Sequence, residues 1–367
     1  MTFDKIKKNF GFGCMRLKMK DGEVDLEEFN RMIDLFMSSG FNYFDTAHGY
    51  IEGKSERAVR ACLTERYPRE SYVLANKHTE WYIKEAADVI PFFESQLEIC
   101  GVDYFDFYLV HCVTRGNYGK FKECKAFETL KQLKDEGRIG HVAMSFHDTA
   151  DVLDMILSEQ SAIEVVQLQI NYLDYDDPGV QSKACYDVAV KHGKKVIVME
   201  PVKGGALVNL PHEASEVLSA LSDRSPASYA LRYAASFPEV FMVLSGMGDL
   251  DMVRDNVATM GNFVPFSEEE YEATDKVREI IRRVSQIPCT ACNYCAEVCP
   301  KEIRISQCFS AYNKVLAATA TRGQAKNELP ADGGQPADCI KCGKCEKVCP
   351  QSIKIRDQLE TIAKKLK

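Results

Sequence analysis

The chain has 367 residues, of which 46% are hydrophobic, and this length is sufficient for one large globular domain and a smaller one. Its net charge of −8 is unevenly distributed, because residues 285–367 carry 13 Lys and Arg against 8 Asp and Glu, whereas residues 1–284 carry 33 against 46. An acidic body with a mildly basic C-terminal part argues against nucleic-acid binding, and no apolar run approaches the length of a membrane span.

The N-terminal part of the chain predicts helices and strands in alternation. Apolar residues from Leu26 to Met37 recur at helical spacing, with Asp25 placed to cap this helix and Gly40 to end it. Eight helix-separated strands predict a (β/α)8 TIM barrel, and the lack of a glycine-rich first turn argues against a doubly wound sheet. The predicted strands are residues 41–44, 72–76, 105–110, 139–144, 165–170, 195–199, 241–244 and 262–264.

Four polar side chains follow the ends of the first three predicted strands. Asp45 ends the first strand, with Tyr50 five residues later, Lys77 ends the second strand and His111 ends the third. These ends meet at one rim of a barrel, where active sites are built. Each residue alone has an ordinary interpretation as a helix cap, a loop aromatic, a surface cation or a core histidine. Together, an acid, a phenol, an amine and an imidazole predict a proton-transfer site.

Two copies of the cysteine pattern C-x2-C-x2-C-x3-C-P lie in the last quarter of the chain. This spacing allows three thiolates from one loop and a fourth from another segment to bind a four-iron cluster, which transfers single electrons. Paired C-x2-C motifs also bind zinc, but a zinc site would leave the third and fourth cysteines of each run unexplained. The pattern therefore favours two [4Fe-4S] clusters. The candidate ligands are Cys289, Cys292, Cys295, Cys299, Cys339, Cys342, Cys345 and Cys349.

The two cysteine runs predict a smaller domain at residues 285–367, after a barrel domain at residues 1–284. Between the runs, the sequence predicts a helix around residues 309–318 and a Gly/Pro-rich loop at residues 327–338. The seven other cysteines show no framework spacing and lie mostly in apolar segments, which predicts reduced, buried thiols. Reduced thiols and an N-terminus without a secretory signal indicate a cytoplasmic protein.

The C-terminal domain resembles the bacterial two-cluster ferredoxins, although the connection between its cysteine runs is longer. In those proteins the fourth cysteine of each run ligates the other cluster. The resemblance implies a small α+β ferredoxin-like domain with two [4Fe-4S] clusters. One cluster would take Cys289, Cys292, Cys295 and Cys349, and the other would take Cys339, Cys342, Cys345 and Cys299.

The barrel domain resembles the aldo-keto reductases over residues 9–265. The resemblance rests on the pattern of Asp45, Tyr50, Lys77 and His111 and on the motifs Gly11–Arg16, Gly53–Glu56, Gly101–Asp106 and Glu200–Gly205. It implies carbonyl reduction in which Tyr50 donates the proton and Lys77 lowers the pKa of its phenol. Asp45 would hold Lys77 in place, and His111 would direct the substrate oxygen toward Tyr50.

The aldo-keto reductase resemblance also implies a nicotinamide cofactor. The fourth strand keeps the family's serine as Ser145 but has Phe146 where the family has asparagine, and Gln167 can bind the ring amide. Residues 245–249 resemble the family's phosphate cradle, yet Arg254 is the only cation near them in the sequence, so strong NADP preference is not expected. The implied cofactor-binding residues are Gly13, Cys14, Met15, Ser145, Gln167, Glu200, Val202, Lys203, Ser245, Gly246, Met247, Asp255 and Asn256.

The two domains differ in the number of electrons that they transfer at once. A nicotinamide passes a hydride and a four-iron cluster passes one electron, and a flavin normally couples the two. The leading hypothesis is an oxidoreductase of the aldo-keto reductase type, using NAD(P)H on a small carbonyl or alcohol and coupled to electron transfer through the clusters. The alternatives are a ferredoxin-linked flavoenzyme with FMN at the barrel mouth and a non-catalytic electron carrier. The basic C-terminal part either helps the domains dock or receives an electron-donor protein such as ferredoxin or flavodoxin.

Overall fold

The computed structural model describes residues 3–283, 286–316 and 320–366. The chain forms two compact units: a barrel unit, residues 1–201 and 227–266, and a cysteine unit, residues 202–226 and 267–367. The predicted domain boundary at residues 284 and 285 lies outside the described residues. The compact units divide the chain elsewhere, because residues 202–226 and helix α11 (Glu268–Arg283) belong with the cysteine runs.

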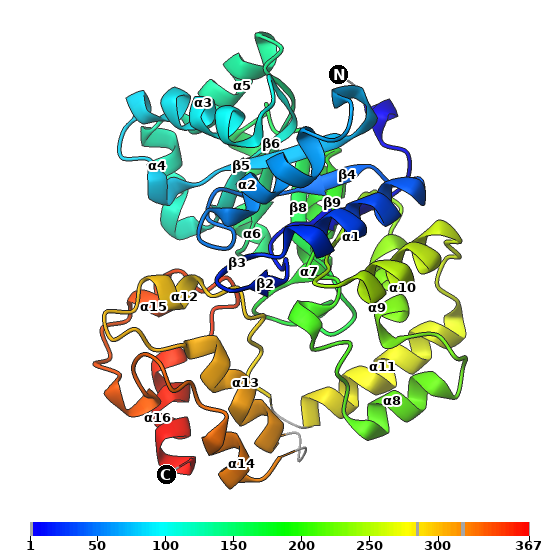
Figure 1. The fold of residues 1–367 in the computed structure, drawn as a ribbon, viewed down its shortest axis with the longest axis vertical. Coiled ribbons are helices and arrows are strands. Elements are labelled where there is room, and N and C mark those ends of the chain that lie inside the picture. Colours follow the sequence, from blue (N-terminus) through cyan, green and yellow to red (C-terminus); the bar gives the residue numbers. More distant parts are fainter. Residues whose placement is uncertain (1–2, 284–285, 317–319, 367) are drawn as a thin grey trace. The chain divides into compact units, whose positions relative to one another are not determined.

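Eight parallel strands close into a barrel in the barrel unit (Figure 1). Their order around the barrel is β1-β10-β9-β8-β7-β6-β5-β4, and β4 pairs with β1 to complete the ring. The barrel fold predicted from the sequence is therefore confirmed. The strands are β1 (Phe10–Gly13), β4 (Tyr43–Asp45), β5 (Val73–His78), β6 (Phe105–Val113), β7 (Ile139–Phe146), β8 (Val165–Gln169), β9 (Lys195–Met199) and β10 (Val240–Gly246).

Local sequence features explain why the helices of the barrel unit form. In α1 (Leu26–Ser38), Asp25 caps the first turn by accepting the backbone N–H of Glu28 at 3.1 Å, and the apolar face is buried. The remaining elements are the hairpin β2 (Met19–Lys20) and β3 (Glu23–Val24), the helices α2 (Lys54–Val59), α3 (Val89–Cys100), α4 (Arg115–Glu123), α5 (Ala126–Asp135), α6 (Ala150–Glu159), α7 (Ser182–Lys191), α9 (Pro226–Ala235) and α10 (Leu250–Gly261), and the short turns η1 (Phe3–Lys5), η2 (Arg60–Thr64), η3 (Arg69–Ser71), η4 (Glu80–Tyr82) and η5 (Ala86–Asp88).

One predicted strand is wrong and one barrel strand is unpredicted. Residues 262–264 form no strand, because they follow directly on α10, and the carbonyl of Val264 accepts the Arg232 Nε–H at 2.9 Å. The eighth strand is instead β1, whose alternating Phe and Gly give a weak strand signal. Glycine leaves room there for neighbouring side chains, since a Cβ on Gly11 would lie 2.7 Å from Leu244 Cδ2.

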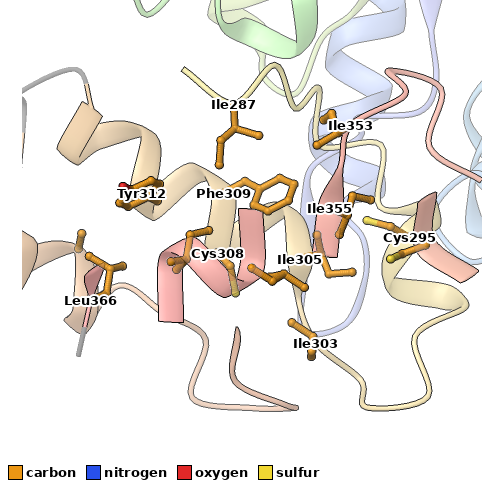
Figure 2. Packing of buried hydrophobic residues seen from close by; sticks show 14 residues of the cluster. Ile287, Cys295, Ile303, Ile305, Cys308, Phe309, Tyr312, Ile353, Ile355 and Leu366 are labelled. Atoms are coloured by element: carbon orange, nitrogen blue, oxygen red, sulfur yellow. The ribbon is translucent and has the colours of Figure 1, made fainter. Parts of the chain in front are cut away.

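The cysteine unit has its own apolar core, which contains the predicted helix between the runs. That helix is α13 (Ile305–Leu316), whereas residues 317–318 of the prediction lie outside the described residues. Figure 2 shows this core, in which Phe309, Ile353 and Ile355 lie toward Cys295. The other elements of this unit are η6 (Lys203–Gly205), α8 (His212–Ser219), α11, α12 (Tyr294–Glu297), α14 (Arg322–Asn327), η7 (Pro336–Asp338), α15 (Lys344–Lys347) and α16 (Ile355–Lys365).

Across both units, none of the described helices has the length and apolarity that a membrane span requires.

The segment that follows β9 packs against both cysteine runs within the cysteine unit. Gly204 has a φ of +62°, and a Cβ there would lie 2.5 Å from the carbonyl oxygen of Thr290. The neighbouring Lys203 has a φ of +45°, and its Nζ donates to Gln351 Oε1 at 3.4 Å. The close backbone approach at Thr290 therefore requires glycine at position 204.

We expect Gly204→Ala to loosen the cysteine unit, because its methyl group would collide with backbone atoms. The matched control is Gly205→Ala, which has the same left-handed strain at a φ of +94° but whose Cβ would have only Asn209 Nδ2 nearby, at 3.7 Å. Thermal unfolding and limited proteolysis should show a loss for Gly204→Ala larger than that of the control by about 1–3 kcal/mol. Equal behaviour of the two variants would contradict the close packing.

Candidate functional site

The inside of the barrel is filled by apolar side chains at every second strand position, up to the layer where the strands end. Beyond this layer, Asp45, Lys77 and His111 continue the inward-facing rows of β4, β5 and β6. The register aligns Asp45 with Ala75 and Lys77 with Leu109, so the three side chains meet at one end of the barrel. The apolar layer comprises Tyr43, Val73, Ala75, Phe107, Leu109, Ala143, Val165, Ile197, Met242 and Leu244.

A fully buried ion pair joins Lys77 and Asp45. Lys77 Nζ donates to Asp45 Oδ1 at 2.6 Å and to the carbonyl oxygen of Thr46 at 2.8 Å. Burial raises the pKa of Asp45, while the charge and the hydrogen bond of Lys77 act against that rise. A buried ammonium is tolerated only when it is paired and hydrogen-bonded. Asp45 and Thr46 therefore fix the position of the Lys77 ammonium.

Tyr50 lies beside Lys77 and is followed by a strained turn. Ile51 and Glu52 have φ values of 53° and 54°, which are unusual for non-glycine residues and typical of functional segments. Lys77 Nζ lies 4.7 Å from the centre of the Tyr50 ring. Burial and, second, the charge of Asp45 raise the pKa of Tyr50 well above its ordinary value. The phenol thus keeps its proton at rest, which differs from the expectation of a pKa lowered by Lys77.

His111 completes the group as a neutral imidazole. Its Nδ1 lies 2.8 Å from Thr79 Oγ1, and its ring centre lies 6.1 Å from that of Tyr50, with the ring planes at 75°. Burial, followed by the charge of Lys77, lowers the pKa of His111 well below its ordinary value. The four residues predicted as a proton-transfer site are therefore brought together in the barrel unit.

The cysteines of the two runs surround two small cavities in the cysteine unit. Among the described residues, no three His, Cys, Asp or Glu side chains converge closely enough to hold one metal ion. Sulfurs arranged around a cavity suit a cluster better than a single zinc ion. The first cavity is lined by Cys289, Cys292, Cys295 and Cys349, and the second cavity by Cys299, Cys339, Cys342 and Cys345.

Comparison with known proteins matches these two sites to two families. The aldo/keto reductase family model matches residues 9–279, and a 4Fe-4S dicluster domain model matches residues 288–353. The chain belongs to the aldo/keto reductase family. Its C-terminal part is a 4Fe-4S dicluster domain.

Several proteins are similar to this aldo/keto reductase over the barrel. The L-galactose dehydrogenase of Arabidopsis thaliana is 25% identical over 76% of this chain and 91% of its own length. A holo structure of an aldo-keto reductase from Bacillus halodurans has a TM-score of 0.61 and 25% identity, covering 73% of this chain and 91% of that one. An aldo-keto reductase of Klebsiella pneumoniae in complex with NADPH has a TM-score of 0.59 over 74% and 90%, and at 19% identity it shows the fold alone.

Two predicted cofactor residues continue the inward rows of β7 and β8 in this aldo/keto reductase. Ser145 Oγ accepts the backbone N–H of Cys112 at 2.8 Å. Gln167 Nε2 lies 3.6 Å from Met199 Sδ, while Gln167 Oε1 is buried and has no hydrogen-bond partner among the described residues. A buried acceptor without a partner requires an explanation, and a ligand amide is one. Gln167 therefore fits the role predicted for it.

The predicted phosphate cradle lies where β1 and β10 end side by side. Gly13 pairs with Gly246, and Ser245 Oγ accepts from Asn256 Nδ2 at 3.2 Å. The cation Arg16, which is not among the predicted residues, lies against this loop, since a Cβ on Gly246 would be 3.0 Å from Arg16 Cδ. The only sequence signal for Arg16 is its place at the end of the Gly11–Arg16 motif.

Asp249 and Arg254 lie near this cradle, are not among the predicted cofactor-binding residues, and have other partners. The carboxylate of Asp249 accepts the Met252 N–H at 2.9 Å and so caps α10, and Arg254 pairs with Asp251 at 2.5 Å. Cys14 and Met247 are buried, Met15 and Asp255 are half-buried, and Glu200 has a φ of +57°. Val202 and Lys203 belong to the cysteine unit.

A network of buried polar side chains supports the end of β5, which carries Lys77. Glu56 Oε1 accepts from Asn76 Nδ2 at 2.8 Å and from Gln96 Nε2 at 2.9 Å. Gln96 Nε2 also lies 3.2 Å from the carbonyl oxygen of Lys77, and Gln96 Oε1 accepts from Tyr108 OH at 2.5 Å. Glu56 belongs to a family motif, but Gln96 on α3 gave no sequence signal. These residues position the β5 end and do not contact the reacting groups.

His78 follows Lys77 but faces outward from β5, where it is buried near Phe92 and Phe121. Neither ring nitrogen has a hydrogen-bond partner among the described residues. Burial lowers the pKa of His78 from 6.5 to about 4. The unfolded chain therefore binds a proton at His78 below about pH 6.5, and the folded chain only below about pH 4, so the free energy of unfolding falls as the pH decreases through this window.

We expect His78→Leu to reduce this loss of stability, because the variant has no proton to bind at that position. Denaturant unfolding at several pH values from about 7 to about 4.5 should give a shallower pH dependence than in the unsubstituted protein. The exposed His212→Leu is the control for replacing a histidine by leucine, and His78→Leu should flatten the curve more than this control does. Parallel curves for His78→Leu and the unsubstituted protein would refute the assignment.

Proposed function

We propose that this aldo/keto reductase interconverts a carbonyl and an alcohol with NADP(H), and that its two [4Fe-4S] clusters exchange electrons with this chemistry. The observation that carries the proposal is the buried grouping of Asp45, Lys77, Tyr50 and His111. A buried ion pair contributes little net stability compared with apolar packing. The presence of this ion pair beside a protonated phenol therefore favours a catalytic barrel. The alternative, in which the barrel is only a platform for an electron carrier, gives no reason for such a pair.

Carbonyl reduction adds a hydride to carbon and a proton to oxygen. When bound, a reduced nicotinamide supplies the hydride. Tyr50 gives its hydroxyl proton to the carbonyl oxygen, and its raised resting pKa ensures that the proton is present beforehand. The Lys77 ammonium stabilises the phenolate that forms, since it lies 4.7 Å from the ring centre. Lys77 therefore acts on the negative charge that develops in the transition state.

His111 suits the role of orienting the substrate oxygen. A neutral imidazole can hydrogen-bond to that oxygen without adding a second positive charge beside Lys77. Its contact with Thr79 Oγ1 at 2.8 Å fixes the ring. The oxygen is thereby directed toward the Tyr50 hydroxyl.

Two features of the barrel support a nicotinamide as the cofactor. The buried Gln167 Oε1 can accept the amide N–H of the nicotinamide ring. Arg16 beside Gly246 supplies a cation for the cofactor phosphates. The sequence near residues 245–249 contains only Arg254 as a cation. No contact among the described residues specifically favours FMN.

The cavities of the cysteine unit support the ligand sets implied by the ferredoxin resemblance. In each cavity, three cysteines come from one run and the fourth from the other. When bound, each cluster would accept or supply one electron, so the two together would match the two electrons of one nicotinamide. All 15 cysteines are free of disulfides, as thiolate ligands and a reducing compartment require.

Tyr50→Phe is expected to abolish most carbonyl turnover while leaving NADPH binding intact, because only the proton is removed. Steady-state assays with a panel of small aldehydes and ketones should show a loss of about 10²–10⁴-fold in kcat. Tyr82→Phe, which removes a half-exposed phenol of the same unit, should retain activity. Unchanged turnover in Tyr50→Phe would refute the proposed proton donor.

The ligand pairing predicts which cysteine variants share a defect. Cys349→Ala should disturb the same cluster as Cys289→Ala, although 60 positions separate them in the sequence. Cys299→Ala should disturb the other cluster together with Cys345→Ala. Electron paramagnetic resonance of the reduced proteins, with iron and sulfide counts, distinguishes the two pairs. If Cys349→Ala instead altered the signal shared by Cys345→Ala, the crossed pairing would be wrong.

A further inference from the structure

The two cysteine cavities differ in the charge of the residues that line them. The first cavity has uncharged polar neighbours, namely Thr290, Asn293, Ser306 and Gln351. The second cavity is lined by three cations, namely Lys301, Lys341 and Arg356. The cysteine unit therefore surrounds one cluster site with positive charge and the other with neutral groups.

The second cavity is also the more exposed to solvent. Cys342 is the only exposed residue among the 15 cysteines, all of which lie in the described part of the chain. The adjacent Ile340 is 58% exposed, the highest value among the exposed large hydrophobic residues of the described chain. A single exposed isoleucine is ordinary, but one at a cluster cavity with cations around it has the composition of a small docking site. We call Lys301, Ile340, Lys341, Cys342, Gly343 and Arg356 the Ile340 face.

The Ile340 face keeps a positive charge after its ion pairs are counted. Lys341 pairs with Glu360 at 2.7 Å, and Arg356 pairs with Glu346 at 2.8 Å. Lys301 forms no ion pair with any described residue, and the segment 338–356 contains five Lys and Arg against two Asp and Glu. This excess attracts an acidic partner at a distance, although the rest of the chain is acidic.

We propose that the Ile340 face is the docking site of a small acidic protein that carries single electrons, such as a flavodoxin or a ferredoxin. Electron transfer slows steeply with distance, so a carrier must approach a cluster that lies near the surface, and Cys342 marks that point. Redox encounters use small interfaces that are steered by charge, and Ile340 supplies the apolar centre. The inference rests on the proposed function in one respect, because it requires clusters in both cavities.

The test measures how fast a reduced, purified flavodoxin bleaches the cluster absorbance in anaerobic stopped flow. The double variant Lys301→Glu/Lys341→Gln should lower the second-order rate constant about tenfold or more at low salt, and high salt should shrink the difference. Ile340→Ser should slow the reaction at every salt concentration. The control Arg322→Gln/Lys326→Glu on the exposed α14 makes the same change in net charge and should react at the unsubstituted rate.

Dithionite, which needs no docking site, should bleach all these variants to the same final extent at high salt, where charge is screened, and so show that their clusters are intact. The inference is overturned if flavodoxin reduces Lys301→Glu/Lys341→Gln as fast as the unsubstituted protein, or if the α14 control slows equally. A protein that dithionite cannot bleach, and that lacks iron and sulfide, would overturn both this inference and the proposed clusters. If flavodoxin reduces Lys301→Glu/Lys341→Gln slowly while dithionite bleaches it normally, the clusters are intact and the docking site is supported.

Discussion

The active-site end of the barrel depends on one constraint, which is that the ammonium of Lys77 is fully buried and must remain paired. Asp45 and the carbonyl of Thr46, at the end of β4, are the partners of this ammonium. The network around Glu56 and Gln96 holds the end of β5, which carries Lys77. Removing one partner of such a pair typically costs about 3–5 kcal/mol, because the remaining charge stays buried. The same ammonium faces the Tyr50 ring, so the interaction that constrains the fold also places a positive charge beside this phenol.

The two units differ in the charge of the residues at their sites. In the barrel unit, burial favours the neutral forms of Tyr50 and His111, since it raises the pKa of Tyr50 and lowers that of His111. The cysteine unit places four cysteines around each of two cavities, and the cavity lined by cations contains the exposed Cys342. The chain passes from β9 of the barrel unit into residues 202–226 of the cysteine unit, where Gly204 packs against Thr290.

Most of the fold and the four central site residues could be predicted, because the barrel strands are apolar runs with polar ends and the cysteine spacing is specific. The strand β1 was missed because glycine at alternate positions removes the apolar signal, while residues 262–264 resembled a strand only in composition. Gln96 and Arg16 could not be predicted, since their roles arise from packing between segments far apart in the sequence. The pKa of Tyr50 was misjudged because sequence shows the neighbouring cation but not the depth of burial.

The central claim is that the clusters and the barrel exchange electrons. The most direct measurement mixes the anaerobic, dithionite-reduced and desalted protein with NADP+, while cluster absorbance, NADPH absorbance and bound flavin are followed in the same sample. Two reduced clusters, NADP+ and one proton would give two oxidised clusters and NADPH. The account predicts that cluster colour returns as NADPH forms, in a ratio of two clusters to one NADPH. Clusters that stay reduced with NADP+, yet reoxidise at once with a one-electron acceptor, would contradict it.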